Sequence, residues 1–188
     1  MRSIWLLIGF LLMFSFPVGE ITLLPVLGFA LILFATLRIE KMEPSFKRAK
    51  YVLFAAIPIA AVLLGLQIYK TALGENAAAW YDTLYLITRL FCEAAECVTM
   101  FFLYLGIRMI GVNAEVPQLE KQSSRNMTLM LVYIVSFVFI TLMRHLIPSS
   151  FEGFEVVAVY PFVLGYIWRA MNIWTAYTLL TKITVSKE

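Results

Sequence analysis

The stretch YVLFAAIPIAAVLLGLQIY, residues 51–69, contains no charged side chain. A helix needs about 20 residues to cross the hydrocarbon core of a bilayer, because each residue adds about 1.5 Å along the axis. Lipid offers no hydrogen-bond partners, so the backbone of a crossing segment must satisfy its own polar groups. Residues 51–69 therefore predict a transmembrane helix, from which the rest of the sequence can be interpreted.

The composition of the whole chain is also strongly apolar. Of its 188 residues, 62% are apolar and 14% are charged, and the mean hydropathy is +0.86. Soluble domains average roughly 45–50% apolar and 25% charged residues. The same numbers exclude disordered, collagen-like, coiled-coil and disulfide-rich classes. We therefore expect an all-α, polytopic membrane helical bundle that forms a single transmembrane domain over residues 1–188.

Five other stretches are apolar enough to cross a membrane as helices. They are residues 4–18, 21–37, 84–107, 127–147 and 156–181. The first two are short, at roughly 22–26 Å if straight, and are expected to form a tight hairpin or to cross only in part. Arg2 and the apolar run after it resemble a signal peptide, but no A-x-A-like cleavage site follows, which favours a retained helix. The sequence thus predicts about six transmembrane helices.

The charged loops predict the orientation of these helices. Eleven of the fifteen Lys and Arg residues fall on one side of the predicted bundle. They are Arg2, Arg38, Lys41, Lys47, Arg48, Lys50, Arg108, Lys121, Arg125, Lys182 and Lys187. Positively charged loops remain in the cytoplasm, so both termini are expected there, which agrees with an even number of helices.

Three features of the loops carry further expectations. The basic loop at residues 40–50 contains Phe46 and is expected to lie against anionic headgroups, although topology marking alone also explains its charge. Trp80 and Tyr81 are expected to anchor the next helix at the membrane interface. Ser123 and Ser124 are expected to cap the helix at 127–147.

Charged side chains inside the predicted helices point to a functional site, because each costs about 2.5–3.5 kcal/mol on insertion scales. Arg89, Glu93 and Glu96 follow i, i+4, i+7 spacing and share one helical face, which Tyr85 extends outward. This face is expected to turn into the bundle, where Arg169 lies at a depth that matches Glu96.

Two interpretations fit these residues: a polar, charge-balanced cavity, or a buried ion-pair network that sets helix register. Arg144 and His145, at the outer end of the helix at 127–147, would form the mouth of the cavity or an interfacial salt-bridge cluster. The candidate ligand-binding residues are Arg89, Glu93, Glu96, Arg169, Asn172, Tyr85, Tyr166, Arg144 and His145.

The leading hypothesis is a transporter-like or solute-binding membrane protein. The arginines would capture a small anionic solute, and Glu93 or Glu96 would exchange a proton. The alternative is a non-transporting partner or assembly subunit, which would engage another membrane protein or a second copy of the chain. An intramembrane enzyme that pairs Cys92 or Cys97 with His145 is the third hypothesis.

Catalytic and cofactor motifs are absent from the sequence. The chain lacks H-E-x-x-H, G-x-S-x-G and a phosphate-binding glycine loop. Its single histidine excludes a multi-histidine metal site, and Glu93-x-x-Glu96 comes without the Glu-x-x-His that bundle di-metal sites use. An enzyme is therefore less favoured than a binding or transport protein, and no cofactor, metal or nucleic-acid partner is expected.

Two resemblances bear on the first third of the chain and on its architecture. The pattern Leu23-Leu24-Pro25-x-x-Gly28-Phe29, followed by EPSFKRAK at residues 43–50, resembles small uncharacterised polytopic membrane proteins of Gram-positive bacteria. This resemblance implies a multi-pass protein of the bacterial plasma membrane. The size and six-helix topology are also similar to the substrate-binding subunits of energy-coupling-factor vitamin transporters, but residues 4–18 lack the small-xxx-small docking pattern expected on their first helix.

Overall fold

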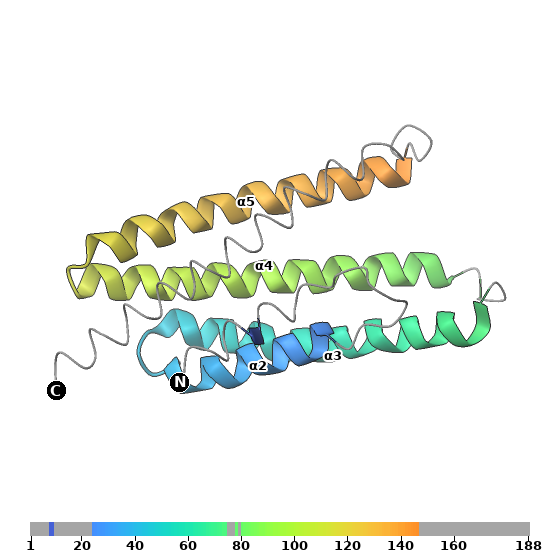
Figure 1. Cartoon of the computed structure of the whole chain (residues 1–188), viewed down its shortest axis with the longest axis horizontal. Helices are drawn as coiled ribbons and strands as arrows, with labels where there is room; N and C mark the ends of the chain where they lie inside the picture. The colour runs from blue at the N-terminus through green and yellow to red at the C-terminus, as the bar shows by residue number, and fades with distance from the viewer. Residues whose placement is uncertain (1–7, 10–23, 75–77, 79, 147–188) are drawn as a thin grey trace. The chain divides into compact units, whose positions relative to one another are not determined.

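A computed structural model describes residues 8–9, 24–74, 78 and 80–146 of the chain. The secondary structure within these ranges is helical: α2 (Leu24–Ile39), α3 (Pro44–Leu73), α4 (Tyr81–Asn113) and α5 (Pro117–Leu146) (Figure 1). The all-helical prediction is confirmed for this part of the chain. Apart from residues 8–9, the predicted helix at 4–18 lies outside the described residues, as does the whole of the one at 156–181.

Two of the described helices, α3 and α4, are long and apolar enough to cross a membrane. Helix α2 is apolar but shorter. The predicted spans at 51–69 and 84–107 lie inside α3 and α4, which extend further at both ends. The prediction that Ser123 and Ser124 cap a helix is wrong, because α5 begins earlier, at Pro117, and both serines lie within it.

The turn between α2 and α3 is shorter than the sequence suggested, because Glu43 and Pro44 start α3 early. The carboxylate of Glu43 accepts a hydrogen bond of 2.6 Å from the backbone N–H of Ser45. Pro44 occupies the first turn, where its missing N–H costs nothing. Phe46 therefore lies inside a helix and is only 1% exposed, so its ring is part of the protein's packing. Whether the basic stretch at residues 40–50 lies against headgroups stays a prediction.

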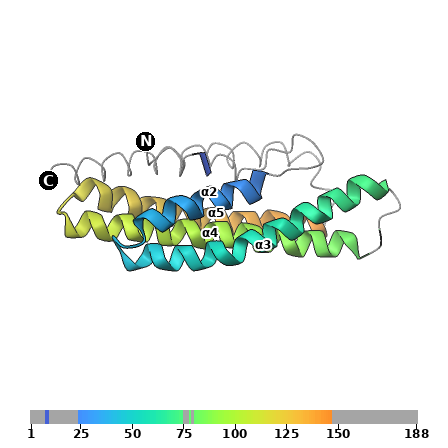
Figure 2. The same cartoon turned by 90° about the horizontal axis from the view of Figure 1, so that it is seen from below.

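The chain divides into two compact units, residues 1–106 and 107–188. In the first unit α2 packs against α3 (Figure 1 and Figure 2). Small side chains of α3 are fully buried in this unit, with Ala49, Ala56 and Ala60 each no more than 1% exposed. Small residues let helix backbones approach closely, which is how helices associate where water supplies no driving force.

Within the same unit, α3 and α4 are joined near both ends. At one end the ring of Phe46 fills the space beside Gly106, where an added Cβ would lie 2.5 Å from Cε1 of the ring. At the other end Tyr69 stacks on Trp80 and Tyr81, with ring centroids 5.5 and 6.1 Å apart. The two helices are thus an antiparallel pair held by aromatic contacts at each end.

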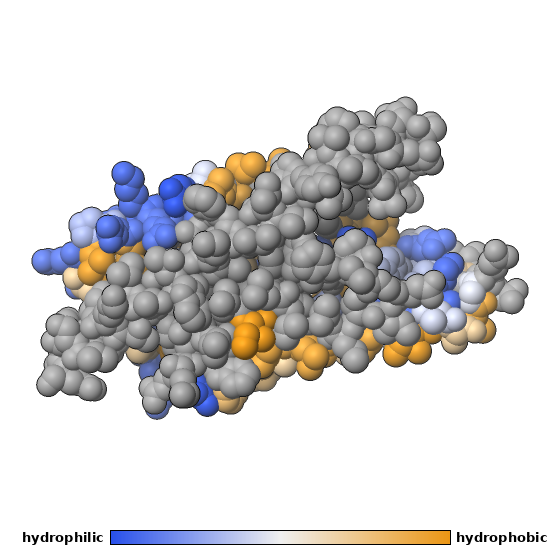
Figure 3. Space-filling model, viewed as in Figure 1, coloured by the Kyte–Doolittle hydropathy of each residue, from blue (hydrophilic) through white to orange (hydrophobic). Residues whose placement is uncertain are grey.

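The outward faces of these helices carry large apolar side chains. On α3 and α4 the most exposed are Tyr51 (59%), Phe54 (53%), Val62 (52%) and Phe91 (61%). Figure 3 shows apolar side chains at the surface of the molecule, along the edge of the view where α2 and α3 lie. Water would penalise this surface, whereas lipid tails would not.

In the second unit, the turn from α4 to α5 is closed by a backbone motif. The N–H of Val116 donates to the carbonyl of Gly111 at 2.8 Å, and that of Glu115 to Val112 at 3.2 Å. This is the Schellman pattern, which places one residue in the left-handed region, usually glycine. Here Glu115 occupies that position with φ 54°. The side chains of Arg108 and Glu120 approach to 3.9 Å beside the turn.

Replacing Gly106 with alanine tests the packing that joins α3 to α4. The new Cβ would collide with the buried ring of Phe46, so we expect a loss of about 1–3 kcal/mol of stability. The matched control is Gly65→Ala on α3, where nothing lies within 4 Å of the added atom and a small gain is expected. Thermal unfolding of both variants in detergent measures the difference, and equal midpoints would contradict this packing.

Replacing Glu115 with glycine tests the strain in the α4–α5 turn. A left-handed conformation costs a non-glycine residue roughly 1–2 kcal/mol, so Glu115→Gly is expected to raise the thermal midpoint. Glu115→Ala removes the same carboxylate but keeps the strain, and should bring no gain. A rise of equal size in both variants would assign the effect to charge instead.

Candidate functional site

The polar face of α4 carries four of the predicted site residues, and burial increases along it from Arg89 to Glu96. Tyr85 is half-buried, Arg89 is exposed, Glu93 is half-buried and Glu96 is 7% exposed. Their spacing aligns them along the axis of one helix. The same helical face is therefore covered unequally along its length, with a cation at the open end and a carboxylate at the closed end.

Glu96 lies in the most closely packed part of this face. Thr99 is fully buried, and Met100 and Leu103 are no more than 3% exposed. The hydroxyl of Thr99 donates to the carbonyl of Ala95 at 2.7 Å, so it is satisfied within the helix. Burying a carboxylate among such neighbours is costly unless it is paired or protonated. Glu93 and Glu96 each take part in a polar or electrostatic interaction in the structure.

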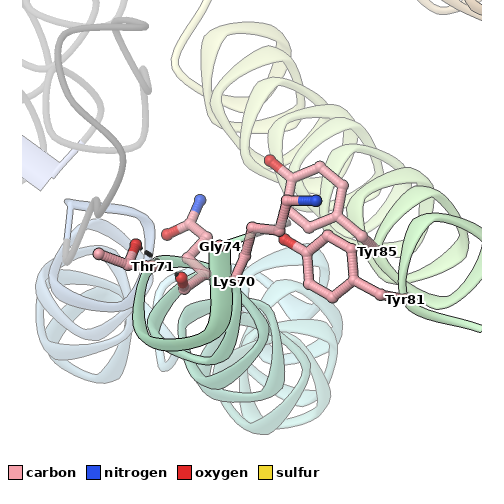
Figure 4. A pocket seen from close by; sticks show the side chains of 6 residues that line it. Lys70, Thr71, Gly74, Tyr81 and Tyr85 are labelled. Atoms are coloured by element: carbon pink, nitrogen blue, oxygen red, sulfur yellow. Dashed lines mark hydrogen bonds between the residues drawn. The ribbon is translucent and has the colours of Figure 1, made fainter. Parts of the chain in front are cut away.

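A pocket opens at the Tyr85 end of the polar face, within the first unit. It has a volume of about 280 Å³ and lies between the end of α3 and the start of α4 (Figure 4). It is lined by Gln67, Lys70, Thr71, Gly74, Tyr81 and Tyr85. Tyr85 thus belongs both to the pocket and to the charged face that leads toward Glu96.

The side chain of Lys70 extends from α3 toward the two tyrosine rings of α4 (Figure 4). Its Nζ lies 5.2 Å from the centre of the Tyr81 ring, within cation–π range. Tyr81 in turn stacks on Tyr85, with centroids 5.7 Å apart. The sequence predicts an interfacial anchor at Trp80 and Tyr81; of these two side chains, Tyr81 is buried and Trp80 is exposed.

Three polar residues of α3 that line the pocket were not predicted as site residues: Gln67, Lys70 and Thr71. The signal that marks them is their place in the chain, because Gln67 is the polar residue within the charge-free stretch and Lys70 follows it directly. Thr71 donates its hydroxyl to the carbonyl of Gln67 at 3.0 Å, so the pair lies on one face of α3. These side chains form a pocket only together with Tyr81 and Tyr85 of α4.

The other end of the α2–α3 hairpin concentrates positive charge. Glu40 binds Lys50 at 2.5 Å, and Arg38 lies 4.2 Å from the centre of the Phe34 ring. Lys41, Lys47 and Arg48 are exposed. The acidic groups of this turn are used within the protein, because Glu43 caps α3 and Glu40 pairs with Lys50.

The remaining candidate residues stay predictions. Arg169, Asn172 and Tyr166 lie outside the described residues, and the same holds for the side chains of Arg144 and His145. Cys92 and Cys97 are buried and are not joined in a disulfide bond. Within the described ranges no group of three His, Cys, Asp or Glu residues is placed to hold a metal ion.

Comparisons with known proteins add no relative to this description. No protein-family model matches the chain, and neither curated proteins nor solved structures give a match.

Proposed function

We propose that the chain is a multi-pass integral protein of the bacterial plasma membrane, transporter-like or solute-binding, in which α4 presents an intramembrane polar face to a small anionic solute. The proposal includes about six membrane-spanning helices and cytoplasmic termini. Its support comes from the described hairpin of α3 and α4, from the sequence pattern and from the burial of Glu96.

One observation carries the membrane placement: α3 has no charged residue between Lys50 and Lys70, yet its outward side chains are exposed. The uncharged stretch measures about 28 Å at roughly 1.5 Å per residue, close to the thickness of a bilayer's hydrocarbon core. A soluble helix of this length would show polar residues on its outward face. A lipid environment is compatible with the apolar side chains on both the outward and the inward face of α3.

The solute role rests on the gradient of burial along α4. Arg89, at the exposed part of the face, would attract an anion, since guanidinium groups bind carboxylates and phosphates with two parallel hydrogen bonds. Glu96 lies about 10 Å further along the axis in buried surroundings, where a carboxylate is costly unless it is paired or protonated. Entry of an anion would thus couple to uptake of a proton by Glu96 or Glu93.

A second function, as a partner subunit, is favoured by one observation. Arg89 is exposed on a helix whose neighbouring side chains Ile87 and Phe91 are also exposed, at 45% and 61%. A cation beside lipid-facing residues is stabilised when another membrane helix supplies a carboxylate. In that case Arg89 serves assembly, and purification in mild detergent yields a companion chain in fixed ratio that Arg89→Leu releases.

The membrane placement can be tested by cysteine labelling with an impermeant maleimide, in a background where Cys92 and Cys97 are replaced by alanine. Lys41→Cys and Asp82→Cys, at opposite ends of the α3–α4 pair, are expected to react from opposite sides of intact cells. Val62→Cys is the decisive position, because its side chain is 52% exposed but is expected to face lipid. It should react only after denaturation.

Two results would contradict the placement. Val62→Cys would react as fast as Lys41→Cys in permeabilised cells if α3 were in water. Labelling of Lys41→Cys and Asp82→Cys from the same side would show that the hairpin does not cross.

The proton-coupled role can be tested in proteoliposomes that contain a pH-sensitive dye. Addition of small carboxylates is expected to drive proton movement in the wild type, and Glu96→Gln should reduce it at least about tenfold because amides do not titrate. The matched control is Glu120→Gln, because Glu120 is a partly exposed residue of α5 whose replacement should leave proton movement unchanged. Proton movement that survives Glu96→Gln would contradict the assignment of Glu96.

A further inference from the structure

The pocket between α3 and α4 is lined by polar groups that differ from those on the polar face of α4. Among the described residues that line it, Lys70 is the charged one and none is acidic. Asp82 is next to Tyr81 in sequence, yet it does not line the pocket. Among the described residues, the neighbour that holds the Lys70 ammonium is the Tyr81 ring at 5.2 Å, which leaves the ammonium its three hydrogen-bond donors.

The depth of the pocket is set by the helix that carries Lys70. This residue directly follows the uncharged stretch of α3, so it comes at the end of about 28 Å of apolar helix. Tyr69, Trp80 and Tyr81 stack around the same level. Lysine beside tyrosine and tryptophan is the composition typical of the headgroup layer, where phosphate is the most abundant anion.

The polar groups of the pocket suit an oxyanion. Lys70 supplies an ammonium, and Tyr81 and Tyr85 carry phenol hydroxyls that can donate hydrogen bonds. Thr71 donates its hydroxyl to the carbonyl of Gln67 and so has only acceptor capacity left, which makes Lys70 and the phenols the decisive donors. The volume of about 280 Å³ is at the lower edge of small-molecule sites, which span roughly 300–1,000 Å³, and fits a head group better than a large solute.

Helix dipoles do not decide the charge preference of this pocket. The start of α4 contributes partial positive charge, and the end of α3 contributes partial negative charge, so the two oppose each other. The formal charge on Lys70 therefore determines which ligands are attracted. Its cation–π contact also restricts the long side chain before a ligand arrives, which lowers the entropic cost of binding.

We infer that this pocket binds a phosphate group at the membrane interface, carried either by the headgroup of an anionic phospholipid or by a free phosphate compound. Lys70 neutralises the phosphate, and the hydroxyls of Tyr81 and Tyr85 donate to its oxygens. The inference rests on the membrane placement proposed above, but not on the solute role of Arg89 and Glu96.

The test measures thermal stabilisation of the full-length protein in detergent as each probe is added. The probes are short-chain phosphatidylglycerol, phosphatidylcholine with the same chains, and inorganic phosphate. A ligand that binds only the folded state raises the thermal midpoint with its concentration, which yields an apparent Kd. Phosphatidylglycerol is expected to stabilise the wild type more than phosphatidylcholine.

Variants separate the pocket from net charge. Lys70→Met is expected to weaken the stabilisation about tenfold in apparent Kd, because a charge-assisted hydrogen bond is lost. Tyr85→Phe, which keeps the ring, should weaken it less, and Lys70→Arg should retain most of it. The matched control is Lys47→Met, an exposed lysine at the opposite end of α3, which should leave the apparent Kd unchanged.

Each outcome either tests the inference or identifies the source of the phosphate group. Stabilisation by phosphatidylglycerol that depends on Lys70 supports a lipid headgroup, and stabilisation by inorganic phosphate that depends on Lys70 supports a free phosphate compound. Stabilisation by the phospholipids that does not depend on Lys70, with none from inorganic phosphate, or equal loss in Lys47→Met and Lys70→Met, would overturn it. The cysteine labelling of Val62 is independent of these results, so failure here leaves the membrane placement standing.

Discussion

The contact of α3 with α4 at both ends is the interaction on which the rest of the described structure depends. Phe46 packs beside Gly106 at one end, and Tyr69 stacks on Trp80 and Tyr81 at the other. Between these contacts α3 has no charged side chain from residue 51 to residue 69. Aromatic packing against a glycine and against other rings is directional, and it supplies the register that apolar surface alone does not.

This arrangement determines where the polar groups of the first unit can lie. α3 has no charged residue between Lys50 and Lys70, so over this length the charges of the pair lie on α4. On its polar face Arg89 is exposed and Glu96 is buried, so the face changes from accessible to enclosed along one helix. Tyr85 belongs to this face and also to the Lys70 pocket.

Much of the described fold could be predicted from the sequence, and the features that could not be predicted have physical causes. The uncharged run at 51–69 predicts a helix because no other structure satisfies its backbone in lipid, and α3 contains it. The ends of the helices could not be predicted from hydropathy. Glu43 and Pro44 start α3 and Pro117 starts α5, and both starts precede the apolar residues that define the predicted spans. Hydropathy reports where a helix meets lipid, whereas caps determine where it begins.

The pocket shows a second limit. Gln67, Lys70 and Thr71 are close together on α3, but their grouping with Tyr81 and Tyr85 depends on how α3 meets α4. The spacing of residues within one helix does not predict how two helices pack together. The alignment of Arg89, Glu93 and Glu96 on one face was predictable from spacing, whereas their different exposure was not, because exposure depends on neighbours along the whole helix.

Amide hydrogen exchange in lipid nanodiscs tests the central claim most directly, namely that α3 and α4 cross the bilayer as a joined pair. The account predicts that amides over 54–66 of α3 stay protected on both the outward and the inward face, while those of the turn at 40–43 exchange rapidly. Exchange of the outward residues Phe54 and Val62 at the rate of the turn would contradict it, because that helix would then face water.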